Sequence, residues 1–371
     1  MTSYITPAEL GENLTLRDLS DPNQGAHAMQ MILANVITDL TSGWNISHET
    51  LRHSPLVAVE DNYDRLGFDP NAVTRDRRYS RYVSPTVMLR SHTSASVPWL
   101  LSSLAGQTNV DQLVAMPGLV YRRDAIDRTH VGAPHQVDLW RICSKPGLDK
   151  NDLEQMIATI VNAVLPETIW RTISATHPYT TLGRQVDVLI NDEWLELAEC
   201  GLIASHLFNR AGLDSAQWCG LALGMGLDRA LMLRKGLDDI RLLRATDPRI
   251  ASQMLDLTPW MPVSVMPPIR RDLSIVIDEN TDEETLGDTV RTALGARVDD
   301  LESVEVLTVT SYVDLPVQAR DRLALSPHQI NALVRITLRP LSSTLTDSEA
   351  NEIRNTVYLA LHEGSILELI S

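Results

Sequence analysis

A proline-rich stretch near residue 260 divides this sequence into two unequal parts. Residues 258–268 read TPWMPVSVMPP and contain four prolines. Proline breaks a helix interior and cannot donate a hydrogen bond within a central strand, so the stretch is predicted to be a linker. The 371 residues are therefore expected to form one domain over residues 1–258 and a second over residues 259–371.

Composition excludes several classes of protein. With 44% hydrophobic and 22% charged residues, the chain has the composition of a globular protein that buries a core. Nothing approaches the roughly 18 consecutive apolar residues of a membrane-spanning helix, and the first residues lack the apolar run of a signal peptide. Three cysteines without a CxxC pair argue against a disulfide framework or a cysteine-rich zinc site. A cytoplasmic protein with no membrane partner is expected.

Hydrophobic spacing in the larger part predicts both helices and strands. The expected elements are a helix over residues 24–42 that ends at Gly43, two strands joined by a charged loop within residues 111–142, a helix over residues 152–165 that ends at Pro166, a hairpin over residues 185–200 with its turn at Asn191-Asp192, and a strand, a turn and a helix over residues 220–233. Together these elements predict an α+β fold.

The smaller part has a different element order. The spacing predicts strand 270–279, helix 281–294, strand 302–315, strand 329–340 and helix 346–363. A βαββα order on about a hundred residues is typical of a ferredoxin-like α+β sandwich.

Residues 120–140 carry side chains suited to nucleotide chemistry. Arg122, His130 and Gln136 lie at two predicted strand ends and on the loop between them. Arginine can bind a phosphate with two parallel hydrogen bonds, so this hairpin could surround a nucleotide. By itself, an arginine-rich hairpin is more often a solvated surface.

Residues 220–233 form a second candidate segment. A Gly224-x-Gly226 turn precedes a helix that bears Arg229. Small residues let a ligand approach the backbone, and Arg229 lies on the first helical turn. The same pattern is about equally typical of an ordinary turn before a helix.

Together the two segments resemble motifs 2 and 3 of the class II aminoacyl-tRNA synthetases, specifically those of the phenylalanyl-tRNA synthetase family. Motif 2 of that family runs roughly YRRDxxDxTHxxxFHQxEG, and its motif 3 is FGxGxxR before a helix and a DDIR-type segment. The matching residues here are Tyr121, Arg122, Arg123, Asp124, Asp127, Thr129, His130, His135, Gln136, Gly224, Gly226, Arg229 and Asp238-Asp239-Ile240-Arg241. Residues 54–68 and 89–96 (LRSHTSAS) are similar to two further family segments, and the part beyond the linker resembles the family's ferredoxin-fold anticodon-binding domain.

The resemblance implies a class II antiparallel sheet flanked by helices, followed by a ferredoxin-like sandwich. It implies a ligase that activates an amino acid with ATP and Mg²⁺ and charges a tRNA. The catalytic and ATP-binding residues implied are Arg122, His130, Gly224, Gly226 and Arg229, with Glu196 as a candidate magnesium ligand or, equally, an outward-facing strand residue. The amino-acid-binding residues implied are His92, Ser94, Gln136, Asp138, His177, Tyr179, Thr181, Glu199 and Ala222.

The chain departs from the family where an amino-acid side chain would bind. The family's FPFTEP reads HPYTTL at residues 177–182 here, and its LGCG reads AECG at residues 198–201. One interpretation is drift within a phenylalanine enzyme, with Tyr179 still stacking on the substrate ring. The other is altered specificity, because His177 and Glu199 would make a more polar site for a substrate with a hydroxyl, an amine or a second charge.

The charge balance leaves the acceptor of the activated amino acid open. The chain has 32 basic and 48 acidic residues, and residues 260–371 hold nine arginines, no lysine and eighteen acidic residues. This is a poor balance for binding RNA. A candidate phosphate-binding strip is formed by Arg270 and Arg271 foremost, with Arg335 and Arg339. The alternative for one of Arg270 and Arg271 is an ion pair with nearby carboxylates such as Asp272.

Three hypotheses for function follow. The first is a ligase that charges tRNA with phenylalanine or a more polar analogue. The second is a synthetase paralogue that passes its adenylate to an amine or a carrier protein, and the third is a non-catalytic RNA-binding paralogue. The presence of Arg122 and Arg229 argues against the third, and the acidic C-terminal part favours the second over the first. Residues 1–258 are expected to activate the amino acid alone, as a monomer or a homodimer.

Overall fold

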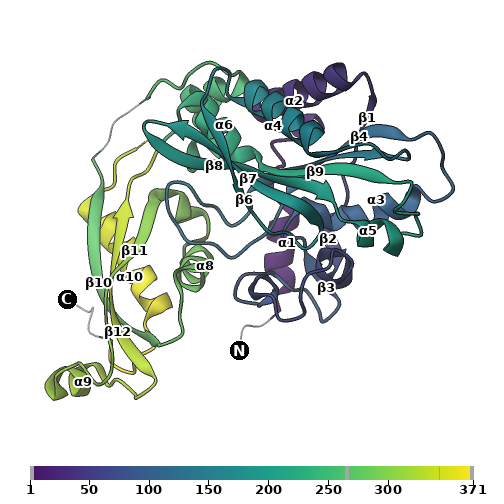
Figure 1. The fold of residues 1–371 in the computed structure, drawn as a ribbon. Helices are drawn as coiled ribbons and strands as arrows, with labels where there is room; N and C mark the ends of the chain where they lie inside the picture. The colour runs from purple at the N-terminus through teal and green to yellow at the C-terminus, as the bar shows by residue number, and fades with distance from the viewer. Residues whose placement is uncertain (1–3, 264–266, 342, 368–371) are drawn as a thin grey trace. The chain divides into compact units, whose positions relative to one another are not determined.

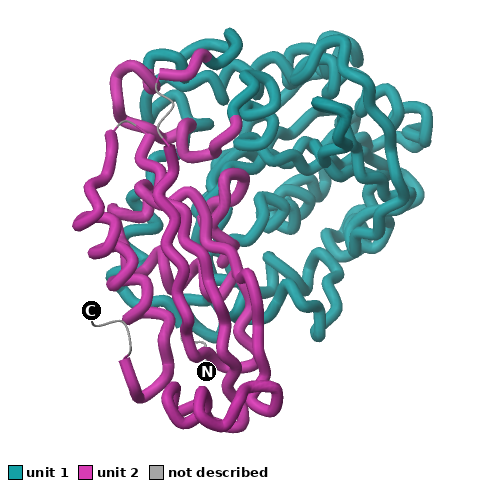
Figure 2. The backbone as a smooth tube through the Cα atoms, turned by 90° about the vertical axis from the view of Figure 1, so that its left-hand side faces the viewer, with its two compact units in different colours: residues 1–122, 133–237, 252–260 teal, residues 123–132, 238–251, 261–371 magenta. Residues whose placement is uncertain are grey.

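The computed structural model describes residues 4–263, 267–341 and 343–367. The chain forms two compact units (Figure 2). The first unit comprises Met1–Arg122, Ala133–Leu237 and Ser252–Trp260, and the second comprises Arg123–Gly132, Asp238–Ala251 and Met261–Ser371. Residues 258–263 and 267–268 contain neither helix nor strand, as the prolines predict, and residues 264–266 of the predicted linker lie outside the described residues.

The first unit contains a seven-stranded sheet that is antiparallel except at one edge. Only β1 and β4 pair parallel among the neighbouring strands described. In spatial order the strands are β1 (Ser47–Thr50), β4 (Asp111–Leu119), β5 (His135–Cys143), β9 (Cys219–Gly226), β8 (Glu193–Ile203), β7 (Thr180–Ile190) and β6 (Trp170–Ser174). A separate antiparallel pair consists of β2 (Leu56–Ala58) and β3 (Val87–Leu89). The predicted antiparallel sheet is confirmed.

Helices cover both faces of this sheet, as Figure 1 shows. One face carries α2 (Ala28–Trp44), α4 (Lys150–Val164) and α6 (Leu227–Lys235), which pack against one another, and the other carries α3 (Val97–Ser103) and α5 (Ser205–Arg210). A further helix, α1 (Pro7–Thr15), begins at a capping box formed by Thr6 and Glu9. The apolar spacing at residues 24–42 is the buried side of α2, which comprises Ala28, Met29, Ile32, Leu33, Val36, Ile37 and Leu40.

Two predictions of local structure concern a hairpin turn and the end of a helix. Asn191 and Asp192 adopt left-handed backbone conformations, with φ of 50° and 66°, as a tight two-residue hairpin turn requires. Helix α4 ends at Val164, two residues before Pro166. Both predictions are therefore confirmed.

Two local predictions are wrong, both at glycines. Helix α2 continues through Gly43 and ends where Asn45 adopts the left-handed conformation, since asparagine can also provide this helix end. The predicted Gly224-x-Gly226 turn is part of β9, and Gly226 is both the last strand residue and the N-cap of α6. The strand therefore leads directly into the helix.

The second unit contains a three-stranded antiparallel sheet in the order β10-β12-β11. Its elements are β10 (Ile269–Asp278), α8 (Glu283–Leu294), β11 (Leu301–Thr310), α9 (Val317–Leu323), β12 (Gln329–Leu338) and α10 (Asp347–Leu361), and residues 238–251 add the short helix α7 (Pro248–Ala251). One face of the sheet packs on α8 and α10 around Leu273, Val290, Val334 and Ile353. The βαββα order matches the ferredoxin-like prediction, and α9 is an addition that the sequence did not predict.

The loop of residues 123–132 belongs to the core of the second unit. Ile126 is 6% exposed within the cluster that includes β10, β12, α8 and α10. The amide of Val304 donates to the Ile126 carbonyl at 3.0 Å, and the Arg291 guanidinium donates to the carbonyls of Asp124 and Ala125. At Gly287 of α8, an added Cβ would lie 2.7 Å from the Asp124 carbonyl oxygen. This loop is therefore held by long-range contacts.

Candidate active site

Three adjacent strands place several of the predicted site residues on one face of the large sheet. Directly opposite residues of antiparallel strands share a face. Across β5, β9 and β8, these partners are Gln136 with Gly226, Asp138 with Gly224, Trp140 with Ala222, Gly224 with Glu199, and Ala222 with Gly201. Residues from distant parts of the sequence thus meet in three neighbouring rows.

A β-bulge brings Glu196 to the same face as Glu199. Residues three apart on a regular strand point to opposite faces. In β8, however, Ala198 pairs with Val186 and Glu196 with Asp187, so Leu197 is the extra residue of a bulge. Burial, followed by the negative charge of Glu199, raises the pKa of Glu196. The sequence carries no signal for this bulge.

Arg229 lies beside this carboxylate. Its guanidinium donates to the backbone carbonyl of Glu196 at 3.4 Å, and its positive charge partly opposes the rise in the pKa of Glu196. Arg229 stands on the first turn of α6, directly after the Gly224 and Gly226 positions. At Gly226, an added Cβ would meet no atom within 4 Å. The backbone here is accessible to a ligand.

Arg122 is exposed just beyond β4, in the first unit. Its Nε donates to the carbonyl oxygen of Ser91 at 2.8 Å, next to His92. His130 lies in the second unit, where its Nδ1 is 2.7 Å from Asp127 Oδ2. Burial opposes ionisation of Asp127, but hydrogen bonds from His130 and Thr129 outweigh it and lower the pKa of that carboxyl. The ionised Asp127 orients the His130 ring.

Asp138 is buried and surrounded by donors. The hydroxyls of Ser94 and Thr93 donate to its two oxygens at 2.8 and 2.5 Å, and Trp140 Nε1 donates at 3.1 Å. Burial raises the pKa of Asp138, whereas these three donors oppose the rise. The carboxyl group is thus occupied by the protein's own side chains.

His92 is a partly buried, neutral imidazole whose two ring nitrogens are shielded from solvent. Its ring stacks on Phe68 at 5.5 Å between centroids, and neither nitrogen has a hydrogen-bond partner of normal geometry in the described part of the chain. Burial, followed by the positive charge of Arg122, lowers the pKa of His92 to about 3. Buried polar atoms without partners are rare in folded proteins and mark places where a ligand or water can bind.

His177 and Glu199 form a pair, and Tyr179 lies among aromatic rings. His177 Nε2 is 3.2 Å from Glu199 Oε2, while its Nδ1 is 3.1 Å from the Thr180 hydroxyl. The neighbouring His177 ring lowers the pKa of Glu199. Thr181 is exposed and pairs with Leu202, so it faces away from the side that Thr180 and Gly201 share. The structure does not bring Thr181 to the other predicted residues.

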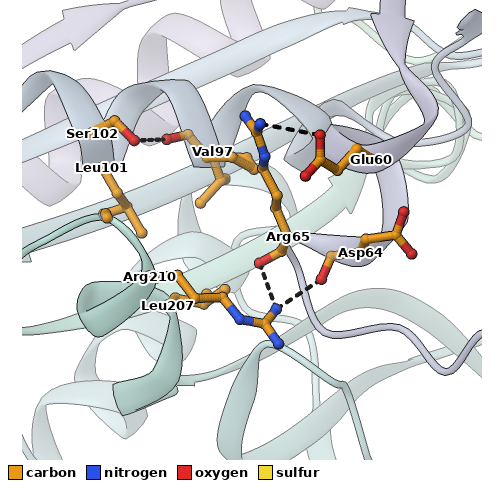
Figure 3. A pocket seen from close by; sticks show the side chains of 10 residues that line it. Glu60, Asp64, Arg65, Val97, Leu101, Ser102, Leu207 and Arg210 are labelled. Carbon is orange, nitrogen blue, oxygen red and sulfur yellow. Dashed lines mark hydrogen bonds and ion pairs between the residues drawn. The ribbon is translucent and has the colours of Figure 1, made fainter. Parts of the chain in front are cut away.

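A separate cavity lies in the first unit, against α3 and α5. Its volume is about 570 Å³, and its wall includes Glu60, Arg65, Val97, Leu207 and Arg210. Figure 3 shows the Arg210 guanidinium donating to the backbone carbonyls of Asp64 and Arg65, at the end of the π-helical turn Glu60–Asp64. None of the predicted binding residues lines it.

The predicted arginine strip of the second unit is largely paired with carboxylates. Arg335 forms two hydrogen bonds with Asp272, both at 2.8 Å, Arg271 binds Asp347 at 2.8 Å, and Arg339 lies 2.7 Å from Glu302. Asp272 thus pairs with Arg335 and not with the adjacent Arg271. Arg270 is exposed on β10.

Comparisons with known proteins identify the family to which the chain belongs. The model of the class II tRNA synthetase core domain (F) matches residues 13–254, so the chain belongs to this family. The chain is 32% identical to the phenylalanine–tRNA ligase alpha subunit of Prochlorococcus marinus over 58% of this chain and 62% of that protein. It is 26% identical to the chloroplastic/mitochondrial phenylalanine–tRNA ligase of Arabidopsis thaliana over 88% of this chain and 74% of the relative. The predicted family is confirmed.

The similarity covers only part of each of these relatives. The chain spans less than two thirds of the length of the alpha subunit that it matches. Among solved structures, a pyrrolysyl-tRNA synthetase of Desulfitobacterium hafniense aligns with a TM-score of 0.46 and 17% identity, over 64% of this chain and 77% of that one. No helix in the described residues is long and apolar enough to cross a membrane.

Proposed function

We propose that this protein activates an amino acid with ATP to form an aminoacyl-adenylate and transfers it to tRNA. Residues 1–258 act as the catalytic domain and residues 259–371 as an anticodon-binding-like domain. The observation that carries the proposal is the Arg229–Glu196 arrangement beside Gly226, in a chain whose family activates amino acids. The protein acts in the cytoplasm, as a monomer or a homodimer.

The chemistry required of the residues is electrostatic. Attack of an amino-acid carboxylate on the α-phosphorus of ATP increases negative charge on the phosphate, and fixed guanidiniums stabilise that charge. Arg122 and Arg229 supply these groups, and His130 lies on the loop that follows Arg122. Because the attacking carboxylate is already ionised, the reaction needs no general base.

Magnesium fits the acidic groups near Arg229. No cluster of three or more metal-ligating side chains is found among the described residues. Mg²⁺ in nucleotide sites binds one or two carboxylates together with substrate phosphates, so Glu196 is sufficient as a protein ligand. The ion, when bound, neutralises charge on the phosphate oxygens.

Two matched arginines on one helix test this proposal. Replacing Arg229→Ala should lower the rate of amino-acid-dependent ATP–pyrophosphate exchange by roughly a hundredfold, the scale of losing one preorganised donor. Arg234→Ala is the control, because Arg234 is also on α6 but its guanidinium donates to the Val164 carbonyl. Equal rates in both variants would contradict the nucleotide site.

A second acceptor remains a candidate because of the second unit's charge. Arg271, Arg335 and Arg339 already bind carboxylates, which leaves fewer cations for an RNA backbone. A synthetase paralogue that passes its adenylate to an amine or a carrier protein would not need these cations for RNA binding. Charging assays with total tRNA distinguish the two acceptors, since only the tRNA ligase attaches the amino acid to RNA.

A further inference from the structure

The aromatic side of the candidate amino-acid site is filled by the protein itself. Tyr179 stacks against Trp140 with centroids 6.3 Å apart and against His177 at 5.9 Å, and Phe68 lies 6.1 Å away. A phenyl ring inserted between two parallel rings needs about 7 Å, because each contact takes about 3.5 Å. Neither stack leaves that space.

The row of Ala222 is equally closed. Ala222 is 2% exposed and Trp140 is 0% exposed, and both belong to a packed apolar cluster with Val97 of α3 and Leu207 of α5. A side chain that extended toward Ala222 would have to displace this cluster, which is costly in a close-packed core. The accessible positions are therefore those beside Gly224 and Gly226.

At Gly224 the surroundings are polar. Glu199 lies directly opposite on β8, and an added Cβ at Gly224 would have Gln136 Nε2 as its nearest neighbour, at 3.3 Å. Asp138 is already bonded to three donors of the protein. Gln136 Oε1 is buried without a hydrogen-bond partner in the described chain, and the Glu199 carboxylate is held by His177 on one oxygen.

Gln136 Oε1 and the Glu199 carboxylate accept hydrogen bonds, whereas Gln136 Nε2 donates. An amide oxygen and an ionised carboxylate offer lone pairs and no proton, so they match a ligand that presents donors. The α-ammonium of an amino acid satisfies one acceptor. The second acceptor then requires a donor on the side chain, since a carboxylate left unpaired by a bound apolar group costs binding free energy.

We propose that the amino acid activated here has a short or flexible side chain ending in a hydrogen-bond donor that binds Glu199, and that phenylalanine does not fit. The inference rests on the proposed activation function and specifies its substrate class. Glu199 and His177 are the residues that determine specificity, with Glu199 in contact with the substrate and His177 as its positioning residue. Side-chain ammonium, guanidinium, amide and hydroxyl groups share this chemistry.

The test is a panel of substrate pairs that differ in the terminal donor. Lysine with norleucine and serine with alanine have closely matched carbon skeletons, and phenylalanine is included. ATP–pyrophosphate exchange should show kcat/KM at least about a hundredfold higher for the best donor-bearing member than for its apolar partner and for phenylalanine. Higher kcat/KM for phenylalanine would overturn the inference while leaving the proposed activation intact.

Two glutamate-to-glutamine variants test whether Glu199 causes the preference for a donor-bearing substrate. Glu199→Gln should reduce the preference for the donor-bearing substrate by about tenfold or more, without a matching loss for the apolar partner. Glu193→Gln is the control on the same strand, because Glu193 is exposed at the hairpin end of β8. An unchanged preference in Glu199→Gln contradicts the role of Glu199.

Amino-acid binding measured without ATP distinguishes a failure of the proposed activation from a failure of the proposed substrate class. Calorimetric titration of the full chain with each panel member should detect the donor-bearing substrate and no phenylalanine. Such binding without any exchange would reject the proposed activation but would still show that the site selects an amino acid with a donor-bearing side chain. If none of the donor-bearing members binds and none supports exchange, the inference fails.

Discussion

The two segments that carry the candidate nucleotide-binding arginines are supported in different ways. Arg229 follows a strand that leads directly into a helix, with Gly226 as the cap, and that strand is paired with β5 and β8 of the same unit. Arg122 precedes a loop whose carbonyls bind Arg291 and whose Ile126 is in the core of the second unit. The first segment is held by neighbouring strands of the first unit, and the loop after Arg122 is held by a residue of the second unit about 170 positions away.

This difference changes the expectation for a truncated chain. From sequence alone, residues 1–258 were expected to suffice, because both arginines precede the linker. The contacts of the loop 123–132 lie with α8 and β11, which the truncation removes. The Arg229 segment keeps its support in the first unit.

Truncation after residue 258 is therefore expected to give the largest effect. Exchange should fall by about a hundredfold, the scale reported for a misplaced reacting group, because the loop after Arg122 loses its anchors. Circular dichroism of the truncated chain provides the control, since the large sheet should remain. Full exchange activity would show that the loop needs no anchor.

A single substitution in α8 sharpens the same comparison. Gly287→Val places side-chain atoms against the Asp124 carbonyl, only 2.7 Å from the added Cβ, and backbone cannot move aside cheaply. The KM for ATP should rise about tenfold, which corresponds to about 1.4 kcal/mol. The control is Gly11→Ala, where the added Cβ meets no atom within 4 Å. An unchanged KM for ATP in Gly287→Val would contradict a role of the loop 123–132 in ATP binding.

Acid should destabilise the Arg122 side of the site through His92. Its pKa is about 3 when folded and about 6.5 when unfolded, so between these values the unfolded chain binds more protons. The stabilising contribution is complete above pH 6.5 and is lost as the pH falls toward 3. Between pH 7 and 5.5 the free energy of unfolding should drop by about 1 kcal/mol more in the wild type than in His92→Phe.

Urea unfolding at the two pH values measures this difference. His48→Gln serves as the control, because His48 is exposed on β1 and should follow the wild type. A His92→Phe variant with the wild-type pH dependence would mean that His92 is not held neutral.

The smallest expected effect concerns RNA. Arg270 is exposed, so Arg270→Ala should weaken tRNA binding a few-fold across sequences and lower the salt slope by about one. Arg335→Ala should leave the slope unchanged, because that guanidinium already binds Asp272 twice. Filter binding over a series of salt concentrations gives both slopes. Equal slopes in the two variants would remove Arg270 from the interface.

Local signals made much of the fold predictable. Apolar runs predicted β4 and β5, Asn191 and Asp192 marked the hairpin turn between β7 and β8, and Pro166 marked the end of α4. Spacing also predicted the βαββα order of the second unit. The error at Gly43 arose because helix ends depend on which residue adopts the left-handed conformation, and here it is Asn45.

The site was predictable only in part, since much of it depends on contacts between distant residues. Motif spacing identified Gln136, Asp138 and Gly224, and sheet pairing then set them in adjacent rows. The stack of Tyr179 on Trp140 joins residues 39 positions apart, and no periodicity in the sequence predicts this contact. The attachment of Ile126 to the second core is a similar long-range contact.

The bulge at Leu197 has an evolutionary consequence for β8. Because side chains alternate, the single extra residue sets the parity between Glu196 and Glu199. Deleting Leu197 would remove the bulge and leave the two carboxylates two residues apart on a regular strand, still on the same side, whereas losing the bulge at the present spacing of three would turn one of them to the opposite side. Relatives that present both carboxylates on this side should therefore either keep the three-residue spacing together with a bulge or have a two-residue spacing in a regular strand.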